Sequence, residues 1–192
     1  MSRVKLVVEG ASDVKFLQDF IKVRFEGVDL KKGDFIEAHS NNLKRIKGRI
    51  ETANKRGECV LLVFDADQSN DLTKARLIDE SGSLNIVLDD VFLFPDNSAE
   101  GNLENLLLNI VNPEMTGVLD CIDSYEMCVR ELVSDDYKAI DNKGRVFIYA
   151  DSFLFGGGAK PGSTDFTESR LWDLNSEHLN PLYEFLRPYF IE

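Results

Sequence analysis

Histidine and cysteine are scarce in this sequence. Its 192 residues include only two histidines, His39 and His178, and three cysteines, with no Cys-x-x-Cys pair among them. So few histidines give little basis for a Ser-His-Asp or Cys-His catalytic site. The odd number of cysteines indicates reduced thiols, and neither a disulfide framework nor a zinc site. A metal site in this chain should therefore use oxygen ligands, which favour Mg²⁺ or Mn²⁺.

Long apolar runs and positive charge are also lacking. No apolar stretch approaches the roughly 20 residues that a membrane helix needs, and the N-terminus lacks the organisation of a signal peptide. We therefore expect a cytoplasmic protein that does not associate with membranes. The net charge of −12 disfavours a protein that coats nucleic acid by charge alone. It leaves open an enzyme that meets phosphates through bound cations, because clustered carboxylates count as negative until metal binds them.

Strands and helices are predicted to alternate through the first 111 residues. Residue patterns predict strands over 4–10, 33–40, 59–67 and 89–96, and helices over 12–25, 42–57, 71–84 and 102–111. Ser12 is the expected N-cap of the first helix. The strongest strands are continuous hydrophobic runs, which is typical of a parallel sheet covered on both faces. The predicted class is therefore α/β, with a mostly parallel sheet flanked by helices.

The pattern changes after residue 111. Helices are predicted over 115–133 and 179–190, whereas 142–155 fits either a helix or a strand and 156–166 is a glycine-rich loop. The chain has no internal repeat and no clear linker. We expect an α/β core over 1–111 and a mainly helical C-terminal extension over 112–192, packed together as one compact unit.

Acidic residues follow two of the predicted core strands. Glu9 ends the first strand, and Asp65 and Asp67 end the third. Sites in parallel sheets form outside the carboxyl ends of the strands, so these three carboxylates converge if the two strands are neighbours. Two divalent cations about 4 Å apart require several such carboxylates. Asp-x-Asp after a strand is weak evidence alone, because aspartate also favours turns.

These motifs resemble those of the Toprim family. "VVEGASDVKFL" carries Glu9 and Gly10, and "LLVFDAD" carries Asp65 and Asp67, with a helix–strand–helix segment predicted between them. The resemblance covers roughly residues 1–111 and implies a Rossmann-like Toprim fold in which these three acids hold Mg²⁺ or Mn²⁺. The end of the chain, "WDLNSEHLNPLYEFLRPYF", also looks like the tail of small stand-alone Toprim-like proteins of uncharacterised function.

Within the family, the sequence is most similar to the Toprim domains of OLD-type (overcoming-lysogenization-defect) nucleases. That similarity implies two further metal ligands, Asp13 and Glu104, although Asn102 stands where the later acidic motif usually begins with an acid or a serine. It also implies a lysine that stabilises charge on a phosphoryl group. Lys143 fits this role best and Lys160 is the alternative. For each of these lysines, an ordinary solvated side chain is the competing interpretation.

The implied function is a nuclease that uses one or two Mg²⁺ or Mn²⁺ ions to cleave DNA or RNA. A separate ATPase partner and a homodimer are both compatible with the resemblance. A non-catalytic module that binds a protein or nucleic acid is one alternative. Another is a haloacid-dehalogenase-like phosphatase, in which Asp65 of "VFDADQS" is the nucleophile and Asp67 the acid/base. That motif normally lies near the N-terminus, and such an enzyme leaves Glu9 unexplained.

Two further features have a structural and a functional interpretation. Asp13 lies in the first turn of a predicted helix, where the helix dipole alone favours a carboxylate. The basic stretch of Lys44, Arg45, Lys47 and Arg49 is typical of a solvated helix face and also fits a phosphate-contacting surface.

Overall fold

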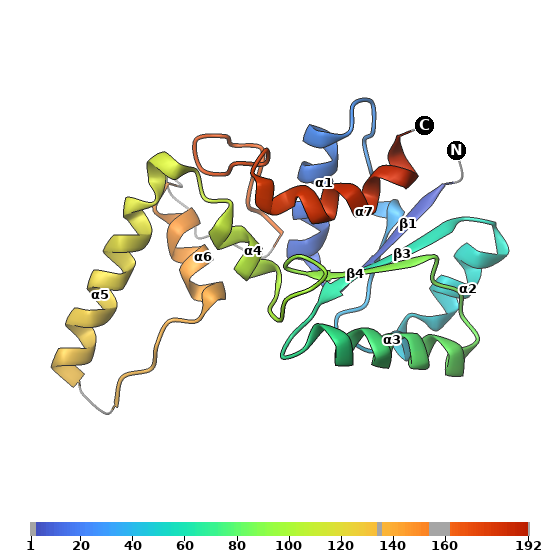
Figure 1. The fold of residues 1–192 in the computed structure, drawn as a ribbon, viewed down its shortest axis with the longest axis horizontal. Coiled ribbons are helices and arrows are strands. Elements are labelled where there is room, and N and C mark those ends of the chain that lie inside the picture. The colour runs from blue at the N-terminus through green and yellow to red at the C-terminus, as the bar shows by residue number, and fades with distance from the viewer. Residues whose placement is uncertain (1–2, 134–135, 154–161, 192) are drawn as a thin grey trace.

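A four-stranded parallel sheet forms the centre of the computed structural model, which describes residues 3–133, 136–153 and 162–191 (Figure 1). The strands lie in the order β2-β1-β3-β4. Their bounds are Val4–Val8 for β1, Phe35–Glu37 for β2, Cys59–Asp65 for β3 and Asp90–Phe94 for β4. The predicted α/β class with a parallel sheet is confirmed.

Helices cover both faces of this sheet (Figure 1). α1 and α7 lie over one face, and α2 and α3 lie over the other. The helices are α1 (Ala11–Arg24), α2 (Lys47–Lys55), α3 (Asn70–Leu84), α4 (Leu103–Asn109), α5 (Gly117–Val133), α6 (Asn142–Asp151) and α7 (Asn180–Phe190). None of the helices in the described part of the chain is long and apolar enough to cross a membrane.

Alternate strand residues enter two separate hydrophobic clusters. Val8 and Val63 pack with α1, α4, α6 and α7, whereas Val7 and Leu62 pack with α2 and α3. Because successive side chains of a strand point to opposite faces, an unbroken apolar run such as Cys59–Phe64 suits a strand buried on both sides. The continuous hydrophobicity of β1 and β3 is therefore what places them at the centre of the sheet.

Three local predictions need correction or completion. Ser12 does not cap α1: the N-cap is Gly10, whose N–H donates to Asp13 Oδ2 at 2.7 Å. The predicted helix over 42–57 is divided at Ile46 into a 3-10 turn, η2 (Leu43–Arg45), and α2. Glu80 of α3 accepts the N–H groups that begin η2, which stabilises the separate turn. The ambiguous segment 142–155 contains a helix, α6, over Asn142–Asp151, and residues 154–155 lie outside the described part of the chain.

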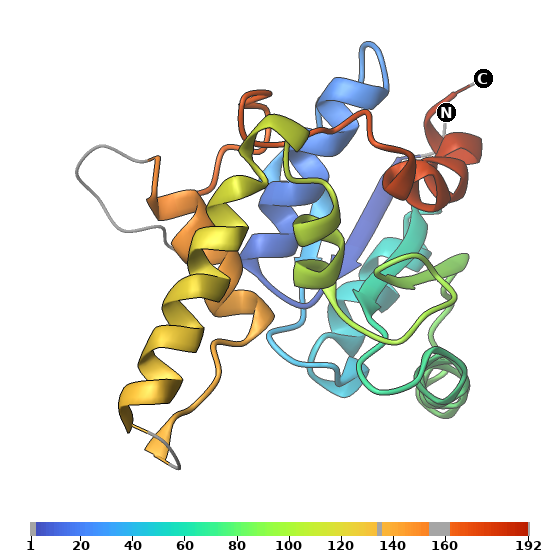
Figure 2. The ribbon, with the colours of Figure 1, turned by 60° about the vertical axis from the view of Figure 1, so that its left-hand side comes forward.

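The C-terminal extension is tied to α1. The buried carboxylate of Asp19 accepts a hydrogen bond from Phe166 N at 2.9 Å and pairs with Lys15 on its own helix. Arg24 donates to the carbonyl of Leu174 at 3.0 Å. The fully buried Trp172 belongs to the same hydrophobic cluster as β1 and α1. By contrast, α5 stands away from the sheet (Figures 1 and 2), and Ile122 is its only buried residue.

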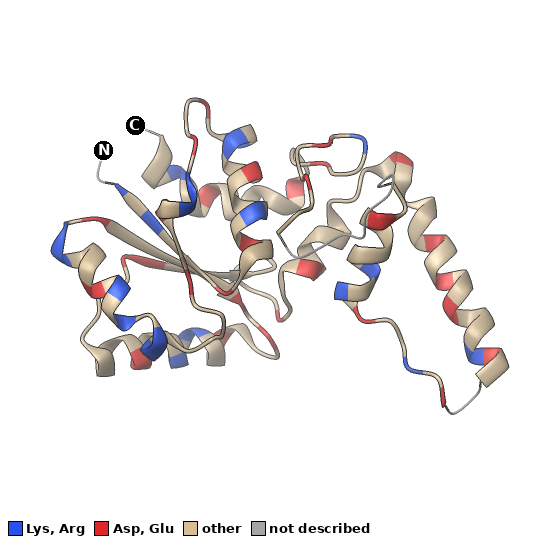
Figure 3. Ribbon diagram, turned by 180° about the vertical axis from the view of Figure 1, so that it is seen from behind, with Lys and Arg blue, Asp and Glu red and all other residues tan. Residues whose placement is uncertain are grey.

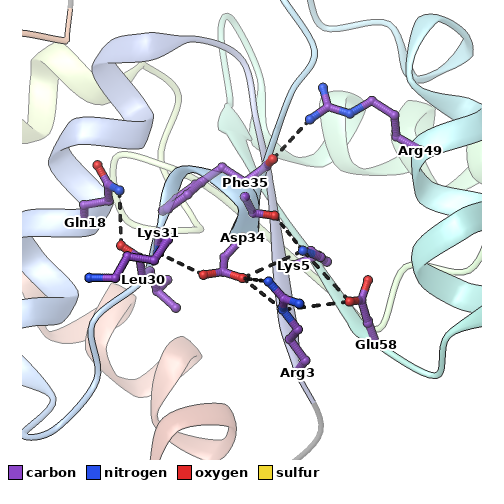
Figure 4. Close-up of polar contacts among 10 residues, drawn as sticks. Arg3, Lys5, Gln18, Leu30, Lys31, Asp34, Phe35, Arg49 and Glu58 are labelled. Carbon is purple, nitrogen blue, oxygen red and sulfur yellow. Dashed lines mark hydrogen bonds and ion pairs between the residues drawn. The ribbon is translucent and has the colours of Figure 1, made fainter.

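Ion pairs balance the charges at the amino ends of the strands (Figure 4). Lys5, which is 8% exposed, lies 3.8 Å from Asp34 and 3.9 Å from Glu58. Arg3 donates to Asp34 at 2.9 Å. Buried or partly buried acids at this edge of the sheet are therefore paired with bases, as buried charges usually are.

Candidate functional site

Glu9 and Asp65 meet at the carboxyl edge of the sheet. β1 and β3 are hydrogen-bonded neighbours, with Val8 aligned to Val63. Glu9 directly follows β1, and Asp65 is the last residue of β3. The backbone N–H of Asp65 donates to Glu9 Oε1 at 3.2 Å. The expected convergence of these two acids is therefore present, because their strands are adjacent.

Two helix N-termini bring further carboxylates to this edge. Asp13, 9% exposed, lies in the first turn of α1, where it accepts the N–H of Gly10. Glu104 lies in the first turn of α4. The first residue of α4 contacts the site directly, because the N–H of Leu103 donates to Asp65 Oδ1 at 2.9 Å. Asn102 caps α4 by accepting from Asn105 N at 3.1 Å, so this side chain serves the helix.

The four acids repel one another in a partly buried setting. Burial, together with the charges of Glu9, Asp13 and Glu104, raises the pKa of Asp65 to about 8, against the hydrogen bond from Leu103. Burial, with the charges of Glu9 and Glu104, likewise raises the pKa of Asp13 to about 7, against the hydrogen bond from Gly10. The pKa of Glu9 is raised for the same main reason, with added repulsion from Asp67 and Glu104. Unlike the acids at the amino ends of the strands, this cluster is largely uncompensated.

Asp67 lies at the mouth of the cluster. It is exposed and has the left-handed backbone conformation, with φ at 55°. Its N–H and C=O both bond to Gly101, each at 2.8 Å. A pocket of about 570 Å³ opens beside it, lined by Asp67, Gln68, Ser69, Leu72, Thr73, Gly101 and Asn102. The loops after β3 and β4 therefore form one polar opening next to the acids.

Replacing Gly101 with alanine should destabilise this opening. Gly101 has a φ of 131°, and an added Cβ would lie 2.8 Å from Asn105 Oδ1 and 3.3 Å from the Pro95 ring. We expect unfolding free energy to fall by about 1–3 kcal/mol, which lowers Tm by roughly 2–4 °C per kcal/mol. Thermal unfolding measures it. Gly48→Ala is the control, because Gly48 faces open space within α2 and should gain about 0.5–1 kcal/mol. An equal or higher Tm for Gly101→Ala would contradict this role.

Lys143, which fits the lysine implied by the resemblance best, does not contact the acids among the described residues. Lys143 is exposed in the first turn of α6, and no hydrogen bond or ion pair connects it to the acids among the described residues. Lys160 lies outside the described residues. The charge of Arg76 of α3 acts on Glu9 and offsets part of the rise in its pKa that burial causes. Sequence reasoning missed Arg76, because it belongs to no motif. The one available signal was its place within about two turns of the N-terminus of α3, the end of that helix that lies at the carboxyl edge of the sheet.

The donor set suits a hard divalent cation. Carboxylate oxygens are the ligands that Mg²⁺ and Mn²⁺ prefer, and the second oxygens of Glu9 and Asp65 accept no hydrogen bond from any described residue. Within residues 3–133, 136–153 and 162–191, no three His, Cys, Asp or Glu side chains are gathered closely enough to hold an ion as they stand. Repulsion between bare carboxylates favours such a spread arrangement.

Comparison with known proteins identifies a family but no activity. Neither the curated proteins nor the solved structures include a match to this chain. A family described as a protein of unknown function, DUF3226, matches residues 3–191, and this description names no Toprim domain. Since the match covers nearly the whole sequence, the chain belongs to the DUF3226 family.

Proposed function

We propose that Glu9, Asp13, Asp65 and Glu104 bind one or two Mg²⁺ or Mn²⁺ ions, with Asp67 contributing from the mouth of the site. The observation that carries this proposal is the uncompensated cluster of carboxylates at the carboxyl edge of the sheet. Burial and repulsion raise the pKa of Glu9, Asp13 and Asp65, so the ionised cluster is costly without a counter-charge. Cation binding requires the carboxylates to turn toward one another and removes that cost.

The chemistry that fits this site is phosphoryl transfer by a Toprim-type nuclease. Bound ions would supply an activated water and stabilise charge on the phosphodiester. The chain itself holds Glu9 and Asp65 through hydrogen bonds from Asp65 N and Leu103 N, so each carboxylate keeps one oxygen fixed. The adjacent polar pocket offers room for a nucleotide beside Asp67. Lys143 retains its proposed role only if α6 approaches the bound substrate.

The phosphatase alternative is weaker on this geometry. An aspartate nucleophile must be ionised and free to attack, whereas Asp65 Oδ1 accepts a backbone N–H and burial raises its pKa to about 8. Glu9 also binds the backbone of Asp65, which that mechanism leaves unexplained. A non-catalytic binding module remains the second candidate. The spread arrangement of the acids in the described residues favours it.

Metal-dependent cleavage of nucleic acid tests the proposal. End-labelled DNA and RNA are incubated with the purified protein in Mg²⁺ or Mn²⁺, with EDTA as the negative control. We expect cleavage that EDTA abolishes and that excess Mn²⁺ restores. Cleavage that persists in EDTA would contradict a metal mechanism. If neither substrate is cleaved while Mn²⁺ raises the Tm of the protein, the non-catalytic module is supported and the nuclease is excluded.

A further inference from the structure

Basic residues are concentrated in one segment of an otherwise acidic chain. Residues 42–57 contain six Lys or Arg and a single acid, Glu51, although the whole chain carries −12. Figure 3 shows Lys and Arg along α2, residues of both charges on α3, and mainly acidic residues on α5. The net positive charge of residues 42–57 within an otherwise acidic protein favours an anionic partner at this surface.

The beginning of this segment lies at the same edge of the sheet as the acids. The loop after β2 starts beside Glu9, because His39 N donates to Glu9 O at 2.8 Å. That loop leads directly into η2, which carries Lys44 and Arg45, and then into α2. Since α2 connects the end of β2 to the start of β3, its first turn lies at the carboxyl edge and its last turn lies at the amino edge.

Arg76 joins this segment to the candidate site. Its guanidinium donates to Asn41 O at 2.9 Å and lies 3.4 Å from Glu80 Oε2. The other oxygen of Glu80 accepts the N–H of Leu43 at 2.9 Å, so Glu80 fixes η2 and Arg76 together. Asn41 follows His39 by two residues, and the N–H of His39 donates to Glu9 O at 2.8 Å, so the hydrogen bond to Asn41 O holds Arg76 beside the loop that borders Glu9. Cationic groups therefore continue from η2 to the border of the acidic cluster.

The charges of η2 are not used within the fold. Lys44 and Arg45 are exposed and form no ion pair within the described part of the chain, whereas Lys47 lies 3.5 Å from Glu51. Arg49 has a structural role, because it donates to Phe35 O and Glu37 O of the edge strand β2. We define the basic ridge as Lys44, Arg45, Lys47 and Arg76.

We infer that the basic ridge binds the phosphate backbone of a nucleic-acid strand whose cleaved bond lies at the carboxylate cluster. This inference rests on the proposed function and specifies its substrate as a strand several nucleotides long. Lys and Arg side chains bind such backbones without reading the bases, and their contribution falls as salt rises. The ridge also explains how a chain of net charge −12 meets a polyanion, since the contact is confined to the basic ridge.

Charge reversal at each end of residues 42–57 distinguishes phosphate binding by the basic ridge from a non-local effect of the protein's net charge. The test variant is Lys44→Glu/Arg45→Glu in η2. The matched control is Lys55→Glu/Arg56→Glu, which makes the same change in exposed residues at the opposite end of α2. Fluorescence anisotropy measures binding of labelled 20-nucleotide DNA and RNA strands, without metal and with Mn²⁺, at several salt concentrations. Circular dichroism verifies that both variants fold.

The η2 variant should bind the strand about tenfold more weakly than wild type at low salt, and its log–log salt slope should fall by about 1–2. The control should change binding less than threefold. Equal weakening by both variants, an unchanged η2 variant, or a wild type that binds neither strand would each overturn the inference.

Hydrolysis of bis(p-nitrophenyl) phosphate, a small diester, tests the catalytic proposal separately from strand binding. Binding without hydrolysis of any diester would leave the ridge standing and remove the nuclease.

Discussion

Replacing Asp65 with asparagine should stabilise the metal-free protein at pH 8. The substitution keeps an oxygen to accept the N–H of Leu103 and removes a charge that burial and three neighbouring acids oppose. We expect a gain of about 2 kcal/mol, or roughly 4–8 °C in Tm for a chain of this size. Thermal unfolding in EDTA measures it. Substitutions that stabilise the fold at a residue of the candidate site are expected where that residue is retained for function at a cost in stability.

The gain should depend on pH in a defined direction. The pKa of Asp65 is raised from 3.8 to about 8 in the folded protein. The folded state therefore binds more protons than the unfolded state between these values, and wild-type stability decreases as the pH rises toward 8. The stability advantage of Asp65→Asn over wild type should consequently be smaller at pH 5 than at pH 8.

Asp71→Asn is the matched control for Asp65→Asn. Asp71 lies in the exposed first turn of α3, where losing a carboxylate costs about 0.3–1 kcal/mol of stability. A lower Tm for Asp65→Asn at pH 8 would contradict the repulsion.

Replacing Glu9 with glutamine should lower metal-dependent cleavage by about 10²–10³-fold, because a lost metal ligand costs several kcal/mol of transition-state stabilisation. Glutamine retains an oxygen for the N–H of Asp65, so the fold at this edge should persist. Initial rates on a labelled strand in saturating Mn²⁺ measure the effect, and the Tm of the variant verifies folding.

Glu100→Gln provides the matched control for Glu9→Gln. Glu100 is exposed in the loop that leads to α4 and lies next to Gly101, close in sequence to the site but outside the carboxylate cluster. Its cleavage rate should remain within about threefold of wild type, since surface substitutions away from such features change little. Equal rates for Glu9→Gln and wild type would exclude Glu9 as a metal ligand, whatever happens at Asp65.

The sequence predicts the fold well because its strongest signals are local. Unbroken apolar runs such as residues 59–64 are typical of strands buried on both faces, and their alternation with helices implies a parallel sheet. That topology places Glu9 and Asp65 at one edge as soon as β1 and β3 are neighbours. The position of these two acids was therefore predictable without any tertiary detail.

Other features of the site depend on packing that sequence spacing does not encode. Asp13 was predicted as a metal ligand, and it also closes the first turn of α1 through Gly10 N. Lys143 lies on α6, whose position is set by its packing against α4 and α5 and not by any motif. Arg76 reaches the border of the site because Asn41 O and Glu80 hold its guanidinium. The Arg76–Glu80 pair has the i,i+4 spacing of a helix, whereas the hydrogen bond to Asn41 O follows from no periodic pattern.

The contrast between the two edges of the sheet is central to this interpretation. At the amino edge, Lys5 and Arg3 accompany Asp34 and Glu58 (Figure 4). At the carboxyl edge, burial and mutual repulsion raise the pKa of Glu9, Asp13 and Asp65, and Arg76, whose charge acts on Glu9, already donates to a neighbouring loop. Structural ion pairs explain the first arrangement, and we propose that a cation from solution balances the second.

A crystal of the wild-type protein soaked in Mn²⁺ tests the central claim most directly, because anomalous scattering locates the ion without reference to activity. The account predicts an anomalous peak at the carboxyl edge of the sheet, roughly 2.0–2.6 Å from carboxylate oxygens of both Glu9 and Asp65. The same soak of an Asp65→Asn crystal should show a weaker peak or none. A wild-type map with no peak between these two residues, or with manganese bound only elsewhere, would contradict the proposed metal site.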